Sequence, residues 1–223
     1  MRAAFITEKE SIEIREVETP EPGPDQVRVR VDYVGICGSD LHYYYEGANG
    51  AFVVKEPLIP GHELSGRIDL DPQGEWEPGT GVTVHPARFG DSQPGIEDEP
   101  HLWPNGSYLG SASTWPHTQG ALSEHLIVER SMIRLLPDAL PVRRAVLAEP
   151  LAVALHGVSK ARNEVAGARV LITGSGPIGL LSIAAALDAG AASVTATDVL
   201  EGPLQRAKDM GASSVINVAE EEV

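Results

Sequence analysis

The sequence predicts a mixed β and α/β fold in two domains: a β-rich domain over residues 1–150, then the first half of a doubly wound parallel sheet over residues 151–223. Short segments between proline and glycine turns fill the first 130 residues, helical spacing begins after Pro141, and a strand, a glycine-rich loop and a helix follow from residue 169. A chain of 223 residues has room for two domains, since one takes roughly 100–200.

The first domain is expected to consist of short strands. Residues 27–33 alternate apolar and polar side chains, as a half-buried strand does. Turn signals rich in proline, glycine and aspartate separate this strand from further ones. The turns lie at residues 20–24, 71–74 and 77–79, and the further strands are predicted at 62–70, 82–84 and 121–128.

Metal-ligand residue types gather early in this domain. Cys37, the only cysteine, precedes Ser39 and His42, and the pair His62 and Glu63 follows a short gap. A thiolate, an imidazole and a carboxylate suit a catalytic zinc, which takes three protein ligands and leaves one position open. Ser39 and His42 stand where they could pass on the proton of an alcohol bound to that metal. The alternative for Cys37 is a small buried hydrophobe.

Helical spacing over residues 142–158 indicates two helices, which we expect Pro150 to separate. The chain then reaches residues 169–173, which read as a buried strand, and the glycine-rich loop 174–179. A helix-like run continues to Asp188. This strand, loop and helix order makes the glycine pattern a credible dinucleotide-binding fingerprint of the Rossmann type, against the alternative of a structural turn without phosphate.

Each position of the loop has an expected role in that fingerprint. Gly174 permits the tight turn, Gly176 lets the backbone approach a pyrophosphate, and Gly179 allows the helix to pack closely on the strand. Pro177 and Ile178 open the helix, whose N-terminus faces the phosphates. Asp198, at the end of the next strand, can accept hydrogen bonds from ribose hydroxyls and would repel a 2′-phosphate. The sequence therefore favours NAD over NADP.

Composition excludes several partner classes. The formal net charge is −15, with 4 Lys and 13 Arg, which argues against binding to nucleic acid or to an acidic membrane surface. The sequence has no apolar run of membrane-spanning length, and its N-terminus becomes charged too early for a signal peptide. We expect a cytoplasmic protein that acts on a small molecule.

Four motifs give the chain a resemblance to the zinc-dependent medium-chain dehydrogenases, in particular to the polyol branch with the sorbitol and L-idonate 5-dehydrogenases. They lie at residues 35–42, 61–63, 148–154 and 174–179, and residues 110–117 look most like the L-idonate enzymes. The resemblance implies a GroES-like zinc domain, a Rossmann NAD domain, and hydride transfer from a secondary alcohol of a sugar acid or polyol to NAD.

The resemblance also implies roles for single residues. Cys37, His62 and Glu63 would be metal ligands. Glu149 stands where ordinary alcohol dehydrogenases of the family carry a cysteine ligand, and would bind zinc or hold its water. Asp40 would orient His62 by accepting its ring N–H, or would instead cap a turn.

Substrate recognition is expected from aromatic and histidine side chains. His117, with Trp115, would place a sugar-acid carboxylate in the cleft, or would be a solvated loop histidine. Tyr44 and its neighbours Tyr43 and Tyr45 would line the mouth of the site or only pack.

The sequence departs from the family at three places. Residues 88–105 lack the cysteines of a structural zinc, so we expect one catalytic zinc and a mobile lobe. Gly202 stands where relatives often place an arginine, which would weaken cofactor binding. The chain stops at Val223, and the half of the cofactor domain that would cover the first strand's edge is absent. We therefore expect a fragment, a chain completed by a separate C-terminal piece or by homo-oligomer contacts, or a non-catalytic remnant that binds zinc or NAD.

Overall fold

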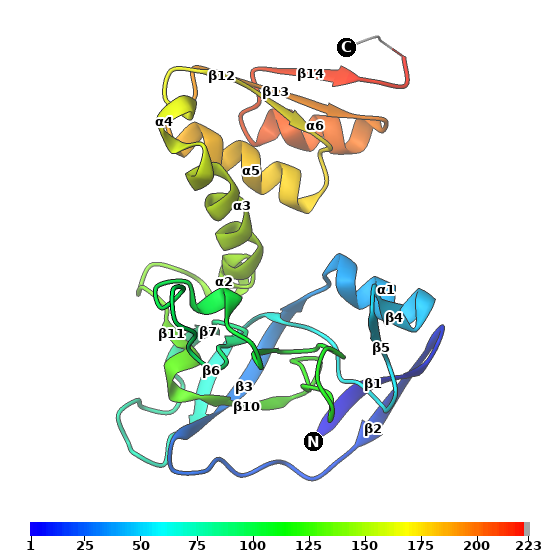
Figure 1. Cartoon of the computed structure of the whole chain (residues 1–223), viewed down its shortest axis with the longest axis vertical. Helices are drawn as coiled ribbons and strands as arrows, with labels where there is room; N and C mark the ends of the chain where they lie inside the picture. The colour runs from blue at the N-terminus through cyan, green and yellow to red at the C-terminus, as the bar shows by residue number, and fades with distance from the viewer. Residues whose placement is uncertain (221–223) are drawn as a thin grey trace. The chain divides into compact units, whose positions relative to one another are not determined.

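The computed structural model describes residues 1–220, apart from the side chains of residues 162 and 163 (Figure 1). The chain divides into two compact units, Met1–Glu149 and Pro150–Val223. The predicted division lies one residue further along, between residues 150 and 151.

A five-stranded antiparallel sheet forms the core of the first unit, with the strand order β10-β3-β6-β7-β11. Alternate residues of β3 face inward, as its sequence pattern predicts: Val27 and Val29 are fully buried, and Val29 is paired with Ile68. The strands are β3 Gln26–Gly35, β6 Glu63–Leu70, β7 Gly81–Val84, β10 His125–Glu129 and β11 Ile133–Leu135.

Small ribbons and short helices surround this sheet. The ribbons are β1 Arg2–Glu8 with β2 Ser11–Glu16, β4 Ala48–Asn49 with β5 Phe52–Val53, and β8 Ala87–Arg88 with β9 Ser107–Tyr108. The helices are α1 Gly38–Glu46, the 3-10 turns η1 Pro100–Leu102 and η2 Arg130–Met132, and α2 Val142–Ala145. The turn η1 lies within residues 88–105, the segment in which the sequence lacks structural zinc ligands, and the strands β8 and β9 flank that segment.

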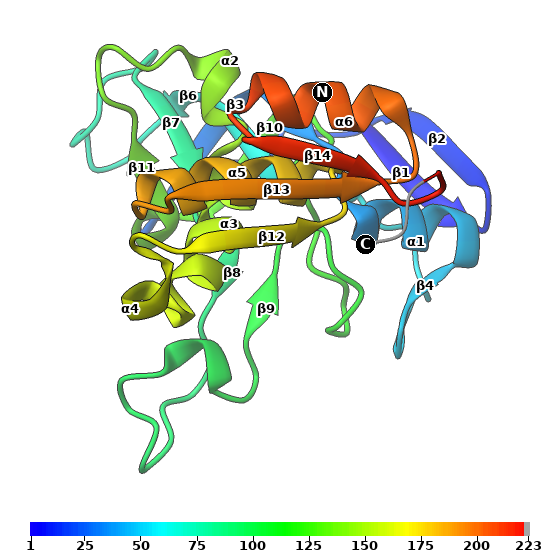
Figure 2. The same cartoon turned by 90° about the horizontal axis from the view of Figure 1, so that it is seen from above.

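The second unit is a parallel α/β layer. Figure 2 shows β12 Arg169–Thr173, β13 Ser193–Asp198 and β14 Ser214–Asn217 side by side and running in one direction. Helices α5 Pro177–Asp188 and α6 Glu201–Asp209 cover one face of this sheet (Figure 1). Within the described residues β12 pairs only with β13, and Leu171 on β12 is 53% exposed. The predicted fold class, mixed β and α/β, is confirmed.

The helices before this layer correct one prediction. Pro150 does not separate them, because α3 runs through it as Ala148–Lys160, and α4 follows as Arg162–Val165. Pro150 lies in the first turn of α3, where a helix does not need the backbone N–H that proline lacks. The break between α2 and α3 falls at residues 146–147 instead.

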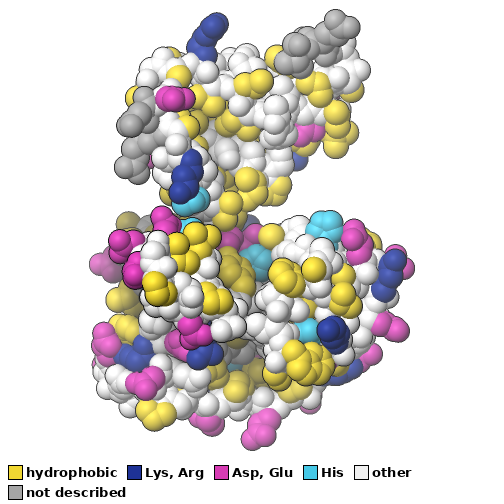
Figure 3. All heavy atoms as spheres, viewed as in Figure 1, with side chains coloured by type: hydrophobic (Ala, Val, Ile, Leu, Met, Phe, Trp, Pro, Cys, Tyr) yellow, Lys and Arg dark blue, Asp and Glu magenta, His cyan; other side chains and the backbone are white. Residues whose placement is uncertain are grey.

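The surface reflects the acidic composition. Figure 3 shows Asp and Glu side chains spread over the visible face of the first unit, with Lys and Arg among them. Among residues 1–220, no helix has both the length and the apolar content required to cross a bilayer.

Candidate metal centre

The turn into α1 positions the cysteine of the candidate site. Cys37 is the N-cap residue of α1, and its backbone N–H donates to Oδ2 of Asp40 at 2.9 Å, the arrangement of a capping box. Asp40 in turn lies in the first turn of the helix, where the helix dipole stabilises a negative charge. The thiol is therefore held at the beginning of a helix, half-buried.

Asp40 also fixes the segment that carries the other two ligand residues. Its Oδ1 accepts the backbone N–H of Gly61 at 3.0 Å, directly before His62, and the side chain is only 4% exposed. Among the described residues, the hydrogen bonds of Asp40 go to these two amides and not to the His62 ring. The capping alternative for Asp40 is therefore the correct one, and Asp40 acts by tying the two ligand segments together.

Cys37, His62 and Glu63 converge as the sequence predicts. One ligand atom from each side chain lies within 4.8 Å of those of the other two. Ligand atoms of a tetrahedral zinc ion with bonds of 2.0–2.3 Å are separated by roughly 3.5 Å, so small side-chain adjustments bring all three into range. A thiolate, an imidazole and a carboxylate also match the donor atoms that zinc prefers, and these residues fit a zinc ion.

Charges at the site perturb each of these groups. A hydrogen bond with His62 lowers the pKa of Cys37 against the effect of burial, and Ser39 assists through its amide and hydroxyl. Burial acts to lower the pKa of His62, but the bond to Cys37 and the negative charge of Asp40 raise it overall. Burial, followed by repulsion from Glu149, raises the pKa of Glu63. A bound cation would relieve the repulsion between these carboxylates.

Glu149 lies near the three ligand residues but outside their group. Its Oε1 accepts a 2.6 Å hydrogen bond from the hydroxyl of Tyr108, on β9. The Tyr108 ring also contacts the His62 ring edge to face, with 5.3 Å between centroids. Burial, together with the bond to Glu149, raises the pKa of Tyr108. The sequence analysis missed Tyr108, because nothing in its local pattern marks it.

A cavity of about 600 Å³ opens beside the site within the first unit. Ser39, Tyr43, His62 and Tyr108 line one part of it, and residues 87–90, 100, 101, 103 and 105–107 line another. No Asp or Glu side chain is among the described residues that line it. Ser39 thus faces the space in which a substrate could bind, and its role in passing on a proton stays a prediction.

His42 is not brought to the cavity. It is exposed on α1, and its Nδ1 lies 3.1 Å from Oε1 of Glu46, one helical turn further on. The predicted role of His42 in passing on a proton therefore finds no contact in the structure. Tyr44 packs against the cluster of Ile6, Tyr43 and Leu58, as the packing alternative has it.

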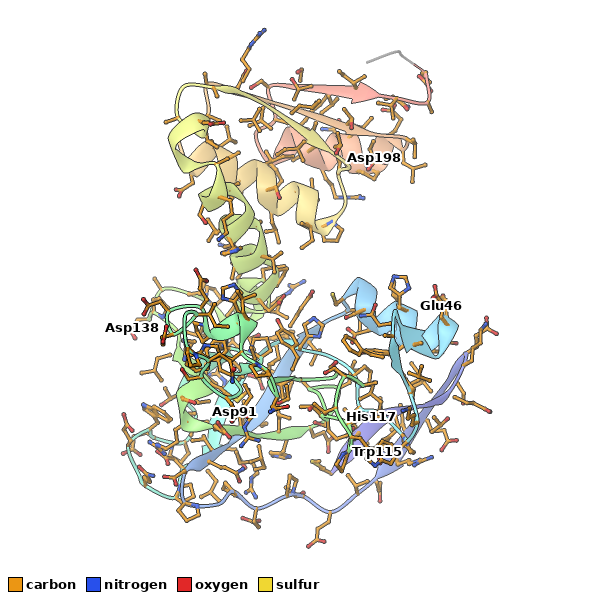
Figure 4. All side chains as sticks on the ribbon, viewed as in Figure 1. Glu46, Asp91, Trp115, His117, Asp138 and Asp198 are labelled. Atoms are coloured by element: carbon orange, nitrogen blue, oxygen red, sulfur yellow. The ribbon has the colours of Figure 1, made fainter. Side chains whose placement is uncertain are left out.

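His117 corrects both predictions made for it. The residue is 6% exposed, so it is not a solvated histidine. Its Nε2 accepts the backbone N–H of Lys55 at 2.9 Å, so its Nδ1 carries the hydrogen and donates to the carbonyl of Thr114 at 2.9 Å. Neither ring nitrogen is left to bind a carboxylate. Trp115 is 64% exposed and lies edge-on to the His117 ring, and neither residue lines the cavity (Figure 4).

The lobe of residues 88–105 is closed by its own hydrogen bonds. The Asn105 side-chain amide donates to Asp91 at 2.8 Å, and the Trp103 indole N–H donates to the carbonyl of Ile96 at 2.8 Å. These bonds join residues that are 14 and 7 positions apart within the lobe. The lobe can therefore form one wall of the cavity without cysteine ligands.

The glycine-rich loop of the second unit has the expected geometry. Gly174 has a φ of +89°, which favours glycine, and a Cβ at Gly179 would lie 1.9 Å from the carbonyl oxygen of Gly174. Gly176 is the N-cap of α5, and a Cβ there would meet no atom within 4 Å. Pro177 begins the helix, and Ile178 follows it, 46% exposed. The backbone is therefore open to a ligand at the helix N-terminus.

Asp198 at the end of β13 is held beside this loop (Figure 4). Its Oδ2 accepts the backbone N–H of Ser175 at 2.9 Å, and its Oδ1 accepts those of Val199 and Leu200. These backbone hydrogen bonds, the one from Ser175 first, lower the pKa of Asp198. The carboxylate is thus ionised and fixed against the loop.

Comparison with known proteins identifies the domain that carries the metal-ligand residues. The family model of the alcohol dehydrogenase GroES-like domain matches residues 23–138, which include Cys37, His62 and Glu63. The chain belongs to this family. The predicted family resemblance is confirmed.

Relatives of this GroES-like chain are named dehydrogenases. A sorbitol dehydrogenase of Bacillus subtilis is 34% identical over 225 residues, covering 100% of this chain and 62% of the relative. An L-idonate 5-dehydrogenase (NAD(P)(+)) of Escherichia coli is 34% identical, covering 97% and 63%. The crystal structure of L-idonate 5-dehydrogenase from E. coli superposes with a TM-score of 0.92 at 33% identity, covering 100% and 64%. The chain thus spans a little under two thirds of the length of these relatives.

Proposed function

We propose that this chain carries the zinc and dinucleotide sites of a dehydrogenase that transfers hydride from a secondary alcohol of a polyol or sugar acid to NAD. The convergence of Cys37, His62 and Glu63 beside a cavity carries this proposal. The relatives named sorbitol dehydrogenase and L-idonate 5-dehydrogenase support the substrate class. The glycine-rich loop of the second unit supports the cofactor class.

The residues of the site then have distinct tasks. Cys37, His62 and Glu63 hold a single catalytic zinc ion, which when bound would supply Lewis acidity to an alcohol oxygen. Ser39, on the wall of the cavity and two residues from Cys37, accepts and passes on the proton that the alcohol loses. Asp40 keeps the two ligand segments in register through the amides of Cys37 and Gly61.

The cofactor proposal is NAD in preference to NADP. Asp198 is an ionised carboxylate fixed beside the loop, where it can accept hydrogen bonds from ribose hydroxyls. A 2′-phosphate would meet its negative charge in a chain whose formal net charge is −15. Gly174, Gly176 and Gly179 let the backbone and the N-terminus of α5 approach the pyrophosphate.

The substrate proposal is L-idonate first, with sorbitol or xylitol as the alternative. The walls of the cavity do not decide between them: they offer hydroxyls, aromatic rings and Arg88, and the Arg88 guanidinium is already paired with Glu129 at 2.8 Å. His117 does not support a sugar-acid substrate, because both of its ring nitrogens are hydrogen-bonded to the backbone and cannot bind a carboxylate. The choice depends on the likeness to the L-idonate enzyme.

A dehydrogenase assay tests the proposal. The zinc-loaded chain is mixed with NAD and with L-idonate, sorbitol or xylitol, and NADH formation is followed by its absorbance. We expect oxidation of at least one of these substrates and its loss in Cys37→Ser. Zinc binding and NAD binding without any NADH formation would instead support the alternative of a non-catalytic remnant. Undiminished oxidation by Cys37→Ser would contradict the proposed site.

A further inference from the structure

Tyr108 makes two separate contacts at the metal centre. Its ring lies against the His62 ring with 5.3 Å between centroids, and its hydroxyl donates to Oε1 of Glu149 at 2.6 Å. The residue is also fixed by strand pairing, since Tyr108 of β9 is the register partner of Ala87 of β8. Its backbone position therefore does not depend on Glu149, and the ring contact does not depend on the hydroxyl.

Tyr108 connects Glu149 to the metal-ligand residues, because one side chain contacts both Glu149 and His62. Yet the Glu149 carboxylate is not among the three ligand atoms that lie within 4.8 Å of one another. Because a carboxylate is a possible zinc ligand, a partner that holds Glu149 elsewhere would favour a site with three protein ligands.

We propose that Tyr108 is a positioning residue whose hydroxyl holds the Glu149 carboxylate away from Cys37, His62 and Glu63, so that the metal has three protein ligands and not four. The inference rests on the metal centre of the proposed function and assigns a task to a residue that the sequence analysis missed. A site with four protein ligands is closed, whereas a site with three keeps a position for water or substrate. The Tyr108 hydroxyl thus separates a catalytic site from a structural one.

The substitution Tyr108→Phe tests this directly, because it removes the hydroxyl and keeps the ring against His62. The affinity for Zn²⁺ is measured by competition with a chromophoric chelator. A released Glu149 should add a ligand, so the Zn²⁺ affinity should rise about tenfold, the scale expected when a hydrogen bond to a charged group no longer opposes binding. Glu149→Gln should cancel this gain in the Tyr108→Phe background and should change the affinity of the otherwise unaltered chain less than about threefold.

The opposite result has an equally clear meaning. If Tyr108 instead supported Glu149 as a ligand, Tyr108→Phe would lower Zn²⁺ affinity by about 10- to 100-fold, as the loss of outer partners of metal ligands does. That fall, or equal effects of Glu149→Gln in the two backgrounds, would overturn the inference. Tyr33→Phe, at an exposed tyrosine of the same unit, is the matched control and should leave the affinity unchanged.

A second comparison does not depend on the folding of Tyr108→Phe. In the otherwise unaltered chain, Glu63→Gln should weaken Zn²⁺ binding far more than Glu149→Gln, and equal losses would contradict the inference. Coordination by Co²⁺ gives an independent spectroscopic readout, because its visible absorption changes with the number of ligands. If the unaltered chain bound no Zn²⁺, the proposed metal centre would be wrong as well. If it bound Zn²⁺ normally but Glu149→Gln had the same effect with and without Tyr108→Phe, only this inference would be wrong.

Discussion

Asp40→Ala should destabilise the first unit strongly, because one carboxylate holds both ligand segments. The side chain is 4% exposed and accepts the N–H groups of Cys37 at 2.9 Å and Gly61 at 3.0 Å. A hydrogen bond to a charged group contributes about 1.5–3 kcal/mol, so the loss of both should lower the free energy of unfolding by about 3–6 kcal/mol. That is a large fraction of the roughly 5–15 kcal/mol typical of a domain.

Urea unfolding of the metal-free chain, followed by tryptophan fluorescence, measures this effect. The three tryptophans, at positions 76, 103 and 115, all lie in the first unit, so the signal reports on that unit alone. Asp138→Ala, at an exposed aspartate of the same unit, is the control and should change stability by no more than about 0.5 kcal/mol. A loss below about 1 kcal/mol in Asp40→Ala would refute the argument that this carboxylate organises the site.

Two further predictions concern other parts of the chain. Asp71 accepts hydrogen bonds from Arg130 and from three backbone amides, and these bonds, that of Arg130 first, lower its pKa to about 2. Asp71→Ala should therefore lower the free energy of unfolding by about 2–4 kcal/mol at pH 7. Because the folded-state pKa of Asp71 lies below the ordinary value of 3.8, the stability difference between the unaltered chain and Asp71→Ala should be complete above about pH 5 and shrink as the pH falls towards 2. Urea unfolding at several pH values measures this difference, and a value that stayed constant over this range would contradict the prediction. Gly179→Ala should weaken NAD binding at least tenfold, measured by calorimetry, because its Cβ would lie 1.9 Å from the Gly174 carbonyl oxygen. Gly202→Ala is the control and should bind NAD normally, because its Cβ would meet no atom nearer than 3.7 Å. Equal NAD affinities of the two variants would contradict the role of close packing at Gly179.

The sequence predicted the parts of the site that depend on local chemistry. Cys37, His62 and Glu63 lie at the ends of strands and at a helix cap, where residue type and spacing carry the signal. The alternation of β3 and the glycine-rich loop of the second unit are equally local patterns. Each of these features could be predicted from a few neighbouring residues.

The features that the sequence did not predict depend on contacts between distant segments. Tyr108 belongs to a strand of two residues, and only pairing with β8 brings it to Glu149. His117 is buried, and its ring accepts a hydrogen bond from the backbone of Lys55, which is 62 residues away in the sequence. Pro150 was expected to break a helix, but the first turn of α3 accommodates it.

Zinc content is the most direct test of the central claim that Cys37, His62 and Glu63 form one metal centre. Elemental analysis of the purified chain should find about one zinc ion per chain. Cys37→Ser and His62→Ala should lose most of it, whereas His85→Ala, at a histidine outside the group, should retain it. Equal zinc content in all four proteins, or none in the unaltered chain, would contradict the account.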